Sequence, residues 1–324
     1  MESREPADDR RSRPLIRVGP AGWSYPDSPG RVYPADAPKK FDVLAYLASY
    51  YDTIEINASF YAPQSPRNYA SWARRVTANP RFKFTAKLWQ KFTHGIGEFG
   101  RADAMRHADA RGDRGTGGRG DWTAADVREV TEGLAELREQ GRLGAILAQF
   151  PWSFKPTSEG LERLERLAAD FTGWPVVVEL RHGAWAQHQH ALFLKSLGLG
   201  FCNIDQPVIG ESLGPTAGVT SEVGYVRLHG RRYDRWFEDN EDAAQRYDYL
   251  YTRDELAPWV ERIRKVAGAD GVQEVYVVSN NHFEGKGPAN ALMIRAMLEG
   301  APVKAPPTLY ATYQSALEPW ARPG

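Results

Sequence analysis

Short runs of β-branched and aromatic residues alternate along the chain with longer segments in which apolar residues recur every three or four positions. The short runs predict eight strands, at residues 16–22, 53–57, 82–87, 144–150, 175–181, 200–205, 225–230 and 274–281. The longer segments predict seven helices, at residues 41–51, 65–76, 123–140, 158–171, 188–198, 252–267 and 287–300. A strand that is followed by a helix crosses back over the sheet, so the strands are expected to be parallel.

Eight strand–helix units are typical of a TIM-type (β/α)8 barrel, which occupies about 250 residues. We therefore predict a single α/β barrel domain over residues 15–300. The weakest unit lies between the sixth and seventh strands, because residues 206–222 show no helical period. An open, doubly wound parallel sheet is the competing architecture.

Three segments stand outside this alternation. Residues 1–14 are charged and contain almost no apolar residue, which predicts a disordered tail. Residues 95–121 follow the third strand and are rich in Gly and Arg, which predicts an inserted mobile loop, either a lid or a solvated segment without a role. Residues 301–324 contain several prolines as well as apolar side chains, so we expect an extension that packs on the barrel.

Composition narrows the class of protein. The 324 residues include 41 Lys and Arg against 41 Asp and Glu, which disfavours the broad positive surface of a dedicated nucleic-acid-binding protein. The lone cysteine, Cys202, excludes an internal disulfide and a metal site built from several cysteines. No apolar run approaches the roughly 20 residues that span a bilayer, and the polar start does not resemble a signal peptide. A cytoplasmic protein without a membrane partner is expected.

Polar side chains gather where the predicted strands end. Residues two apart share one face of a strand, and such polar pairs end three strands: Glu55 with Asn57, Glu179 with Arg181, and Arg227 with His229. In a barrel of this type the side chains that perform chemistry project from these carboxyl ends. Further candidates at the same end are Trp23, Tyr25, Lys87, Gln149, Asp205, Asn280 and Asn281.

This concentration of charge has two interpretations. Charges inside a barrel are costly unless they are paired or hydrogen-bonded. One interpretation is an internal ion-pair network that rigidifies the barrel, for instance Arg181 with Glu55 or Glu179. The interpretation favoured for the set as a whole is a polar pocket that binds a ligand.

The residue types favour a small anionic or polyhydroxylated ligand, such as a sugar-like or nucleotide-like molecule. Arginines bind phosphate or carboxylate in a bidentate manner, the amides donate and accept, and aromatic rings offer flat surfaces; the expected ligand-binding residues are Arg181, Arg227, Asn57, Gln149, Asn280, Asn281, Asp205, Trp23, Tyr25 and Tyr61. Trp23 could also simply cap the barrel core. Proton transfer is assigned to Glu55 and Glu179, with Lys87 or His229 as the partner acid.

Such a site would suit a hydrolase, an isomerase or a lyase without a redox cofactor. A divalent metal could in principle use Glu55, Glu179, Asp205 and His229. Three cationic side chains at the same mouth oppose a bound cation, so we predict neither a metal nor another cofactor. Two alternative functions remain. One is a metal-assisted phosphodiesterase that acts on nucleic acid, although nucleic acid is a less favoured partner than a small molecule. The other is a ligand-binding protein without turnover. The assembly state is left open.

Several segments resemble one known family. GPAGWSYP from residue 19, TIEINASFYAPQSP from 53, FKFTAKLWQKFTH from 82, VVVELRHGAW from 176, YVRLHGR from 225 and SNNHFEGKGPANAL from 279 are together similar to the YecE-like proteins, known as domain of unknown function 72. The resemblance extends from about Ile16 to Met297. It implies a TIM-type barrel and no defined activity. The chain departs from the family pattern in the Gly/Arg-rich insertion, around His282, and in its C-terminal extension.

Overall fold

A computed structural model of the chain describes residues 14–94, 121–233 and 247–324. The predicted tail over residues 1–14 and the predicted inserted loop over residues 95–121 fall almost wholly outside the described residues. Every strand and helix expected from the sequence lies within them.

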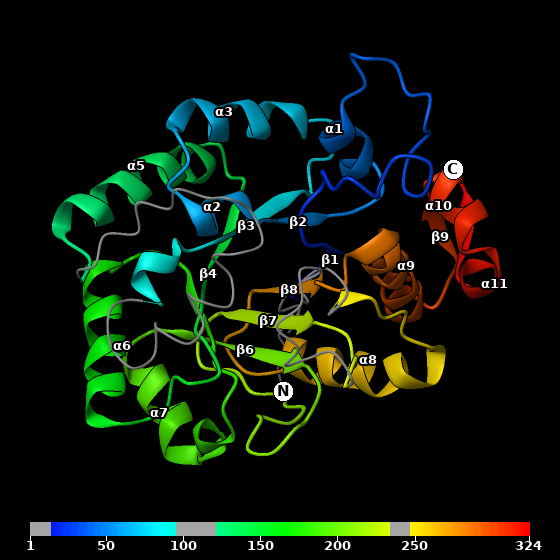
Figure 1. The fold of residues 1–324 in the computed structure, drawn as a ribbon. Helices are drawn as coiled ribbons and strands as arrows, with labels where there is room; N and C mark the ends of the chain where they lie inside the picture. Colours follow the sequence, from blue (N-terminus) through cyan, green and yellow to red (C-terminus); the bar gives the residue numbers. More distant parts are fainter. Residues whose placement is uncertain (1–13, 95–120, 234–246) are drawn as a thin grey trace, which may run out of the picture.

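Eight parallel strands form one sheet around the centre of the molecule (Figure 1). Along the sheet they follow the order β1-β8-β7-β6-β5-β4-β3-β2, and each lies within two residues of its predicted bounds. The strands are β1 (Leu15–Pro20), β2 (Thr53–Ile56), β3 (Lys83–Lys87), β4 (Leu143–Gln149), β5 (Val176–Glu179), β6 (Gly200–Asp205), β7 (Val223–Leu228) and β8 (Glu274–Ser279).

The two ends of this sheet, β1 and β2, meet and nearly close the barrel. Ala21 and Glu55 form a parallel bridge, and the Gly22 amide donates to the Glu55 carbonyl oxygen at 2.8 Å. The backbones approach so closely that a Cβ on Gly19 would lie 1.8 Å from the Thr53 carbonyl oxygen. The close crossing therefore requires glycine at this position. The TIM-type barrel is confirmed, and the open doubly wound sheet is not formed.

Helices surround the ring of strands, as Figure 1 shows for α3, α5, α6, α7, α8 and α9. Their apolar faces pack on the outer face of the sheet, which explains the recurrence of apolar residues every three or four positions. The helices after the strands are α1 (Val43–Ala48), α2 (Ala58–Tyr61), α3 (Pro66–Arg75), η1 (Gln90–Phe92), α5 (Ala124–Glu139), α6 (Ser158–Asp170), η2 (Gly183–Ala186), α7 (His188–Ser196), α8 (Arg253–Ala267), η4 (Phe283–Gly285) and α9 (Lys286–Glu299). In the described ranges, none of the helices is long and apolar enough to cross a bilayer.

The connection from β6 to β7 contains no helix over residues 206–222, as its sequence indicated. A buried amide organises it instead. Asn203 Nδ2 donates to the Gly218 carbonyl oxygen at 3.0 Å, and Asn203 Oδ1 accepts from the Gly218 amide at 2.7 Å. These bonds fasten the loop to the strand that it leaves.

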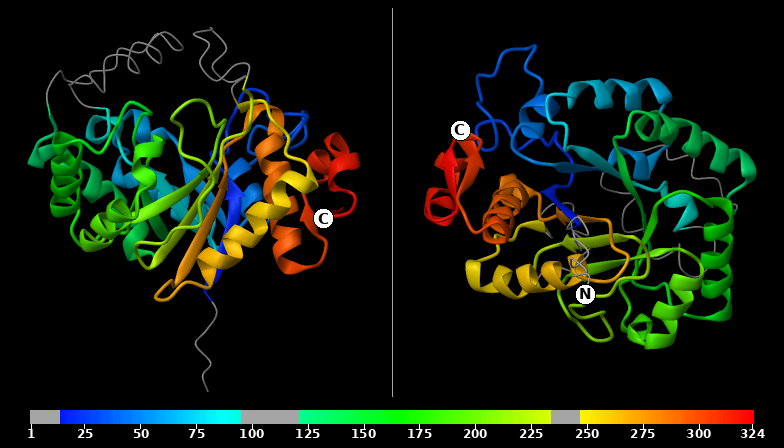
Figure 2. Two further views of the ribbon diagram at one scale, coloured as in Figure 1. Left: turned by 90° about the horizontal axis from the view of Figure 1, so that it is seen from below. Right: turned by 180° about the vertical axis from the view of Figure 1, so that it is seen from behind.

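The C-terminal segment lies against α9 on the outside of the barrel, seen as the red segment in Figure 2. It consists of β9 (Val303–Ala305), α10 (Pro307–Thr312), α11 (Gln314–Leu317) and β10 (Ala321–Pro323), with β9 and β10 paired in parallel. Leu309, Leu317 and Ala321 are fully buried and belong to the same apolar core as the barrel. The prolines limit its helices to short ones.

Candidate functional site

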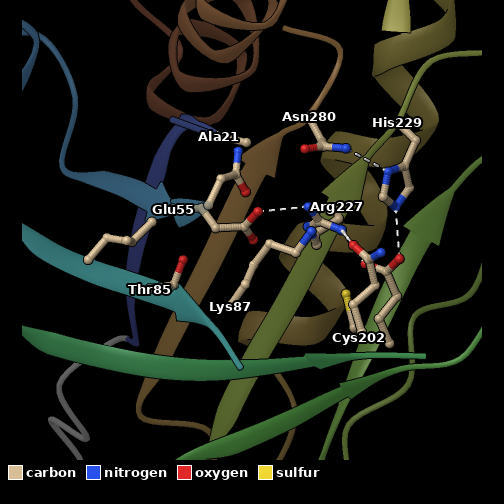
Figure 3. A network of polar contacts seen from close by, with 12 residues as sticks. Ala21, Glu55, Thr85, Lys87, Cys202, Arg227, His229 and Asn280 are labelled. Carbon is tan, nitrogen blue, oxygen red and sulfur yellow. Dashed lines mark hydrogen bonds and ion pairs between the residues drawn. The ribbon is translucent and has the colours of Figure 1, made fainter. Parts of the chain in front are cut away.

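Three charged side chains from three different strands meet inside the carboxyl end of the barrel, and Figure 3 labels two of them, Glu55 and Arg227. Arg227 Nη2 lies 2.7 Å from Glu55 Oε1, and Arg227 Nη1 lies 2.5 Å from Glu179 Oε2. The same Nη1 donates to Gln149 Oε1 at 3.0 Å. Glu55, Glu179 and Arg227 are all 0% exposed, so each charge is stabilised by its partners rather than by water.

Glu179 has more charged and polar neighbours among the described residues than Glu55 has. Its Oε1 atom accepts from Arg181 Nε at 2.8 Å and lies 3.2 Å from His229 Nε2. Burial raises the pKa of the Glu179 carboxyl, but Arg227, His229 and Arg181 outweigh burial and hold this pKa well below its usual range. Glu179 therefore stays ionised, and the pairing of Arg181 with Glu179 expected for an ion-pair network is present.

His229 connects Glu179 to the end of β8. Asn280 Nδ2 lies 3.0 Å from His229 Nδ1 (Figure 3). Because an amide nitrogen only donates, Nδ1 accepts and Nε2 carries the hydrogen that faces Glu179. Burial lowers the pKa of His229 to about 3, although Glu179 opposes this shift. His229 is thus a neutral donor that orients the carboxylate.

Glu55 has partners that the sequence did not single out. The Tyr225 hydroxyl lies 3.0 Å from Glu55 Oε2 and 2.8 Å from Thr85 Oγ1, and both side chains are fully buried. Tyr225 is two residues before Arg227 and therefore faces the same interior. That spacing was the available signal for Tyr225, whereas Thr85 carried none.

Lys87, the last residue of β3, differs from the other charged groups. Its Nζ lies 4.2 Å from the centroid of the Phe60 ring, and no carboxylate of the described residues lies within ion-pair distance of it. Burial lowers the pKa of the Lys87 ammonium, and Arg227 lowers it further, to about 7 in spite of Glu55 and Glu179. Lys87 therefore exists as a mixture of amine and ammonium near neutral pH.

The groups that a ligand can reach lie above the buried charges. Arg181 keeps 16% of its side chain exposed, whereas Glu179 beneath it keeps 0%. The other partly exposed polar residues at this end are Asn57, Lys87 and Gln149. The mouth is thus a partly accessible layer of polar donors above a dry layer of ion pairs.

Aromatic side chains border Asn57 on one side of the mouth. Asn57 Nδ2 donates to the Tyr25 hydroxyl at 3.0 Å, and this hydroxyl donates to the Ala21 carbonyl oxygen at 2.8 Å. The Tyr25 ring stacks on His282 with centroids 4.3 Å apart. Asn57 Oδ1 is buried and has no hydrogen-bond partner in the described part of the chain.

Trp23 and Tyr61 flank this group in different ways. Trp23 is partly buried and packs edge-to-face on Trp72, with centroids 5.3 Å apart, and so contributes to the core as well as to the rim. Tyr61 is 60% exposed and lies beside Phe60, with ring centroids 5.4 Å apart. Of the two rings, Tyr61 is the more accessible to a ligand.

Two further predicted residues, Asp205 and Asn281, are bonded to other parts of the chain and not to the Arg227 network. Asp205 accepts from Arg231 Nε at 2.9 Å. Asn281 Nδ2 donates to the Tyr249 carbonyl oxygen at 2.7 Å and to Asn290 Oδ1 at 2.8 Å. Both anchor neighbouring chain segments.

The carboxylates considered for a metal site are bound to arginines. Glu55 and Glu179 contact Arg227, and Asp205 contacts Arg231. Within residues 14–94, 121–233 and 247–324, His, Cys, Asp and Glu side chains form no group of three or more arranged to hold a metal ion.

The sequence of this chain is similar to those of known proteins. The sequence matches the model of the family described as protein of unknown function DUF72 over residues 17–312. It is 26% identical over 297 residues to the UPF0759 protein YunF of Bacillus subtilis, which covers 88% of this chain and 95% of that protein.

Two solved structures have a fold similar to that of this chain. A DUF72 family protein from Thermotoga maritima is 30% identical with a TM-score of 0.71, covering 88% of this chain and 99% of that one. A DUF72 family protein from Enterococcus faecalis is similar in fold, with 24% identity, a TM-score of 0.70 and coverage of 88% and 96%.

Proposed function

We propose that this chain, which belongs to the DUF72 family of proteins of unknown function, is an enzyme that binds a small anionic or polyhydroxylated molecule at the mouth of its barrel and transfers a proton through Lys87. The observation that carries the proposal is the position of Lys87. It is a partly exposed residue beside a buried ion-pair network whose carboxylates are already bound by arginines.

The balance of charges favours an anion. Glu55 and Glu179 carry two negative charges, and Arg181 and Arg227 carry two positive charges that contact them. His229 is neutral, so a protonated Lys87 leaves the network with one unbalanced positive charge. A carboxylate or phosphate group would balance this charge in a site of low dielectric constant, where the attraction is strong.

Arg181 offers a hydrogen-bond donor to such an anion. Its Nε and Nη2 atoms both contact Glu179 Oε1, at 2.8 and 2.7 Å. Nη1 has no hydrogen bond or ion pair to any described residue, and it belongs to a side chain that is 16% exposed. Gln149 and Asn57, which are partly exposed, supply amides for hydroxyl groups.

The proton-transfer role belongs to Lys87 rather than to the carboxylates. A general acid–base group is most effective when its pKa lies near the working pH, and the Lys87 pKa of about 7 meets this condition. Glu179, with its pKa held low, orients the arginines instead. This assignment replaces the expectation that Glu55 and Glu179 exchange the proton.

Ligand binding can be tested by thermal shift with inorganic phosphate and with pairs of sugar phosphates and their parent sugars. We expect phosphorylated compounds to raise the Tm of the wild type and to raise it much less in Arg181→Met. Arg67→Met is the matched control, because Arg67 is an exposed residue of α3, and it should respond like the wild type. Equal responses of all three proteins would place the ligand elsewhere.

Turnover is tested on whichever compound binds. The compound is incubated with the protein in D2O, and proton NMR follows hydrogen exchange or product formation. We expect the wild type to act on it and Lys87→Gln to bind it without turnover. Binding by the wild type without exchange or product would contradict the enzyme and indicate a ligand-binding protein.

A further inference from the structure

We propose that the substrate is a small aldehyde or ketone that carries a carboxylate or phosphate group, and that Lys87 Nζ forms a reversible imine with its carbonyl carbon. This inference rests on the proposed function, because it uses the same mouth and the same amine. It adds the class of substrate and a covalent step.

Lys87 differs from the other partly buried lysines of the described residues in having no carboxylate partner among them. Lys83, Lys91 and Lys286 keep only 26%, 16% and 18% of their side chains exposed, and each is paired with a carboxylate, of Glu274, Asp126 and Asp248 respectively. Lys155 lies 3.8 Å from Glu211. Among the described lysines of intermediate exposure, Lys87 alone lacks a carboxylate partner in the described part of the chain. A carboxylate partner would keep the amine protonated, whereas burial and the nearby Arg227 and Arg181 disfavour the ammonium.

An amine that attacks a carbonyl group must be unprotonated and reachable. Desolvation beside other cations is an established means of producing such a lysine. Lys87 meets both conditions, since Phe60 covers its Nζ at 4.2 Å and the residue is partly exposed. It extends from the end of a strand towards Arg227, so its position is set by the barrel rather than by a loop (Figure 3).

The neighbouring donors select the rest of the substrate. Arg181 Nη1, which belongs to a side chain that is 16% exposed, suits one oxygen of a carboxylate or phosphate. The buried Asn57 Oδ1, which has no hydrogen-bond partner in the described part of the chain, suits a substrate hydroxyl. A neutral carbonyl compound would use only the second of these groups.

The step balances without an oxidant or reductant. Neutral Lys87 Nζ adds to the carbonyl carbon, the carbonyl oxygen takes up a proton, and the carbon–oxygen bond then breaks to release water. Counted from the ammonium, a double bond forms between Nζ and the carbonyl carbon while the carbon–oxygen double bond breaks, two ammonium protons leave with the oxygen as water, and the imine keeps the positive charge. That charge stays where the ammonium was, so the network with Glu55 and Glu179 is undisturbed.

The test uses the full chain and traps the imine with sodium cyanoborohydride at pH 7. The probes are pyruvate, dihydroxyacetone phosphate and, as the neutral match, dihydroxyacetone. We expect one adduct per chain, located at Lys87 by peptide mass spectrometry, with at least one anionic probe. Dihydroxyacetone should react at least about tenfold more slowly. Lys91→Met should be labelled like the wild type, and Lys87→Met and Lys87→Arg should not be labelled at this position.

Three outcomes would overturn the imine. Labelling spread over exposed lysines such as Lys39 and Lys40, at equal rates in wild type and Lys87→Met, shows no special amine. An anionic probe that raises the Tm through Arg181 but leaves Lys87 unlabelled removes the imine and leaves the proposed function intact. No labelling together with no Arg181-dependent Tm shift by any anion removes both.

Discussion

Arg227 and Glu55 form an ion pair of 2.7 Å between two side chains that are both 0% exposed, although 172 residues separate them in the sequence. β7 and β2 are not neighbours in the sheet, so the pair crosses the interior of the barrel. Arg227 also contacts Glu179 on β5. One guanidinium therefore joins three strands beneath the mouth where the proposed ligand would bind.

Replacing Arg227 should destabilise the barrel strongly. Arg227→Met leaves two buried carboxylates without their shared cation, a change that typically costs about 3–5 kcal/mol. Arg264→Met is the control, because the Arg264–Glu261 pair is 47% and 70% exposed, and it should cost less than about 1 kcal/mol. Urea unfolding at pH 7 measures both. A loss below about 1 kcal/mol in Arg227→Met would show that the pair is not as dry as its burial indicates.

Replacing Lys87 should stabilise the protein at neutral pH. Its pKa falls from 10.5 in the unfolded chain to about 7 in the folded one, so the unfolded state binds more protons between these values. Stability therefore rises as the pH increases from about 7 to 10.5, and the penalty is fully present below pH 7. We expect Lys87→Met to gain roughly 1–3 kcal/mol at pH 7 and to lose this advantage by pH 10. Unfolding curves at both pH values give the comparison, and a loss of stability at pH 7 would contradict the depressed pKa.

His229 should make the protein sensitive to mild acid. Its pKa of about 3 in the folded chain lies below the ordinary 6.5, so the unfolded state binds the extra proton between these values. Stability falls as the pH decreases from about 6.5 towards 3. We expect His229→Gln to lose about 1–2 kcal/mol less than the wild type between pH 6.5 and 5, a range above the titration of Glu179. The exposed His188, changed to Gln, is the control and should retain the wild-type slope.

Replacing Asn281, at the end of β8, should reduce stability without affecting ligand binding. Its amide bonds to Tyr249 and Asn290 are internal to the fold, so Asn281→Ala should reduce stability by about 1–3 kcal/mol. The rise in Tm produced by a bound anion should stay the same as in the wild type. A ligand response that disappears in this variant while the fold is retained would place Asn281 in the binding site.

The architecture was largely predictable because it rests on local patterns. Each strand lies within two residues of its expected bounds, since strand positions follow from short apolar runs and the breaks between them. Spacing by two also assigned Glu179 and Arg181 to one face. Thr85 and Asn203 escaped prediction, because a buried hydroxyl or amide gains its role only from the partner that the fold brings to it.

The amino-acid sequence by itself determined the barrel, the end of the barrel where polar groups gather and the residues that gather there, because these depend on periodicities of two and of about 3.6 residues. Only the tertiary structure decided which charges meet. Arg227 forms ion pairs with both Glu55 and Glu179. Lys87 lies above the Phe60 ring and has no carboxylate partner among the described residues. Pairing and desolvation depend on distances across a closed ring, and no spacing along the chain contains them.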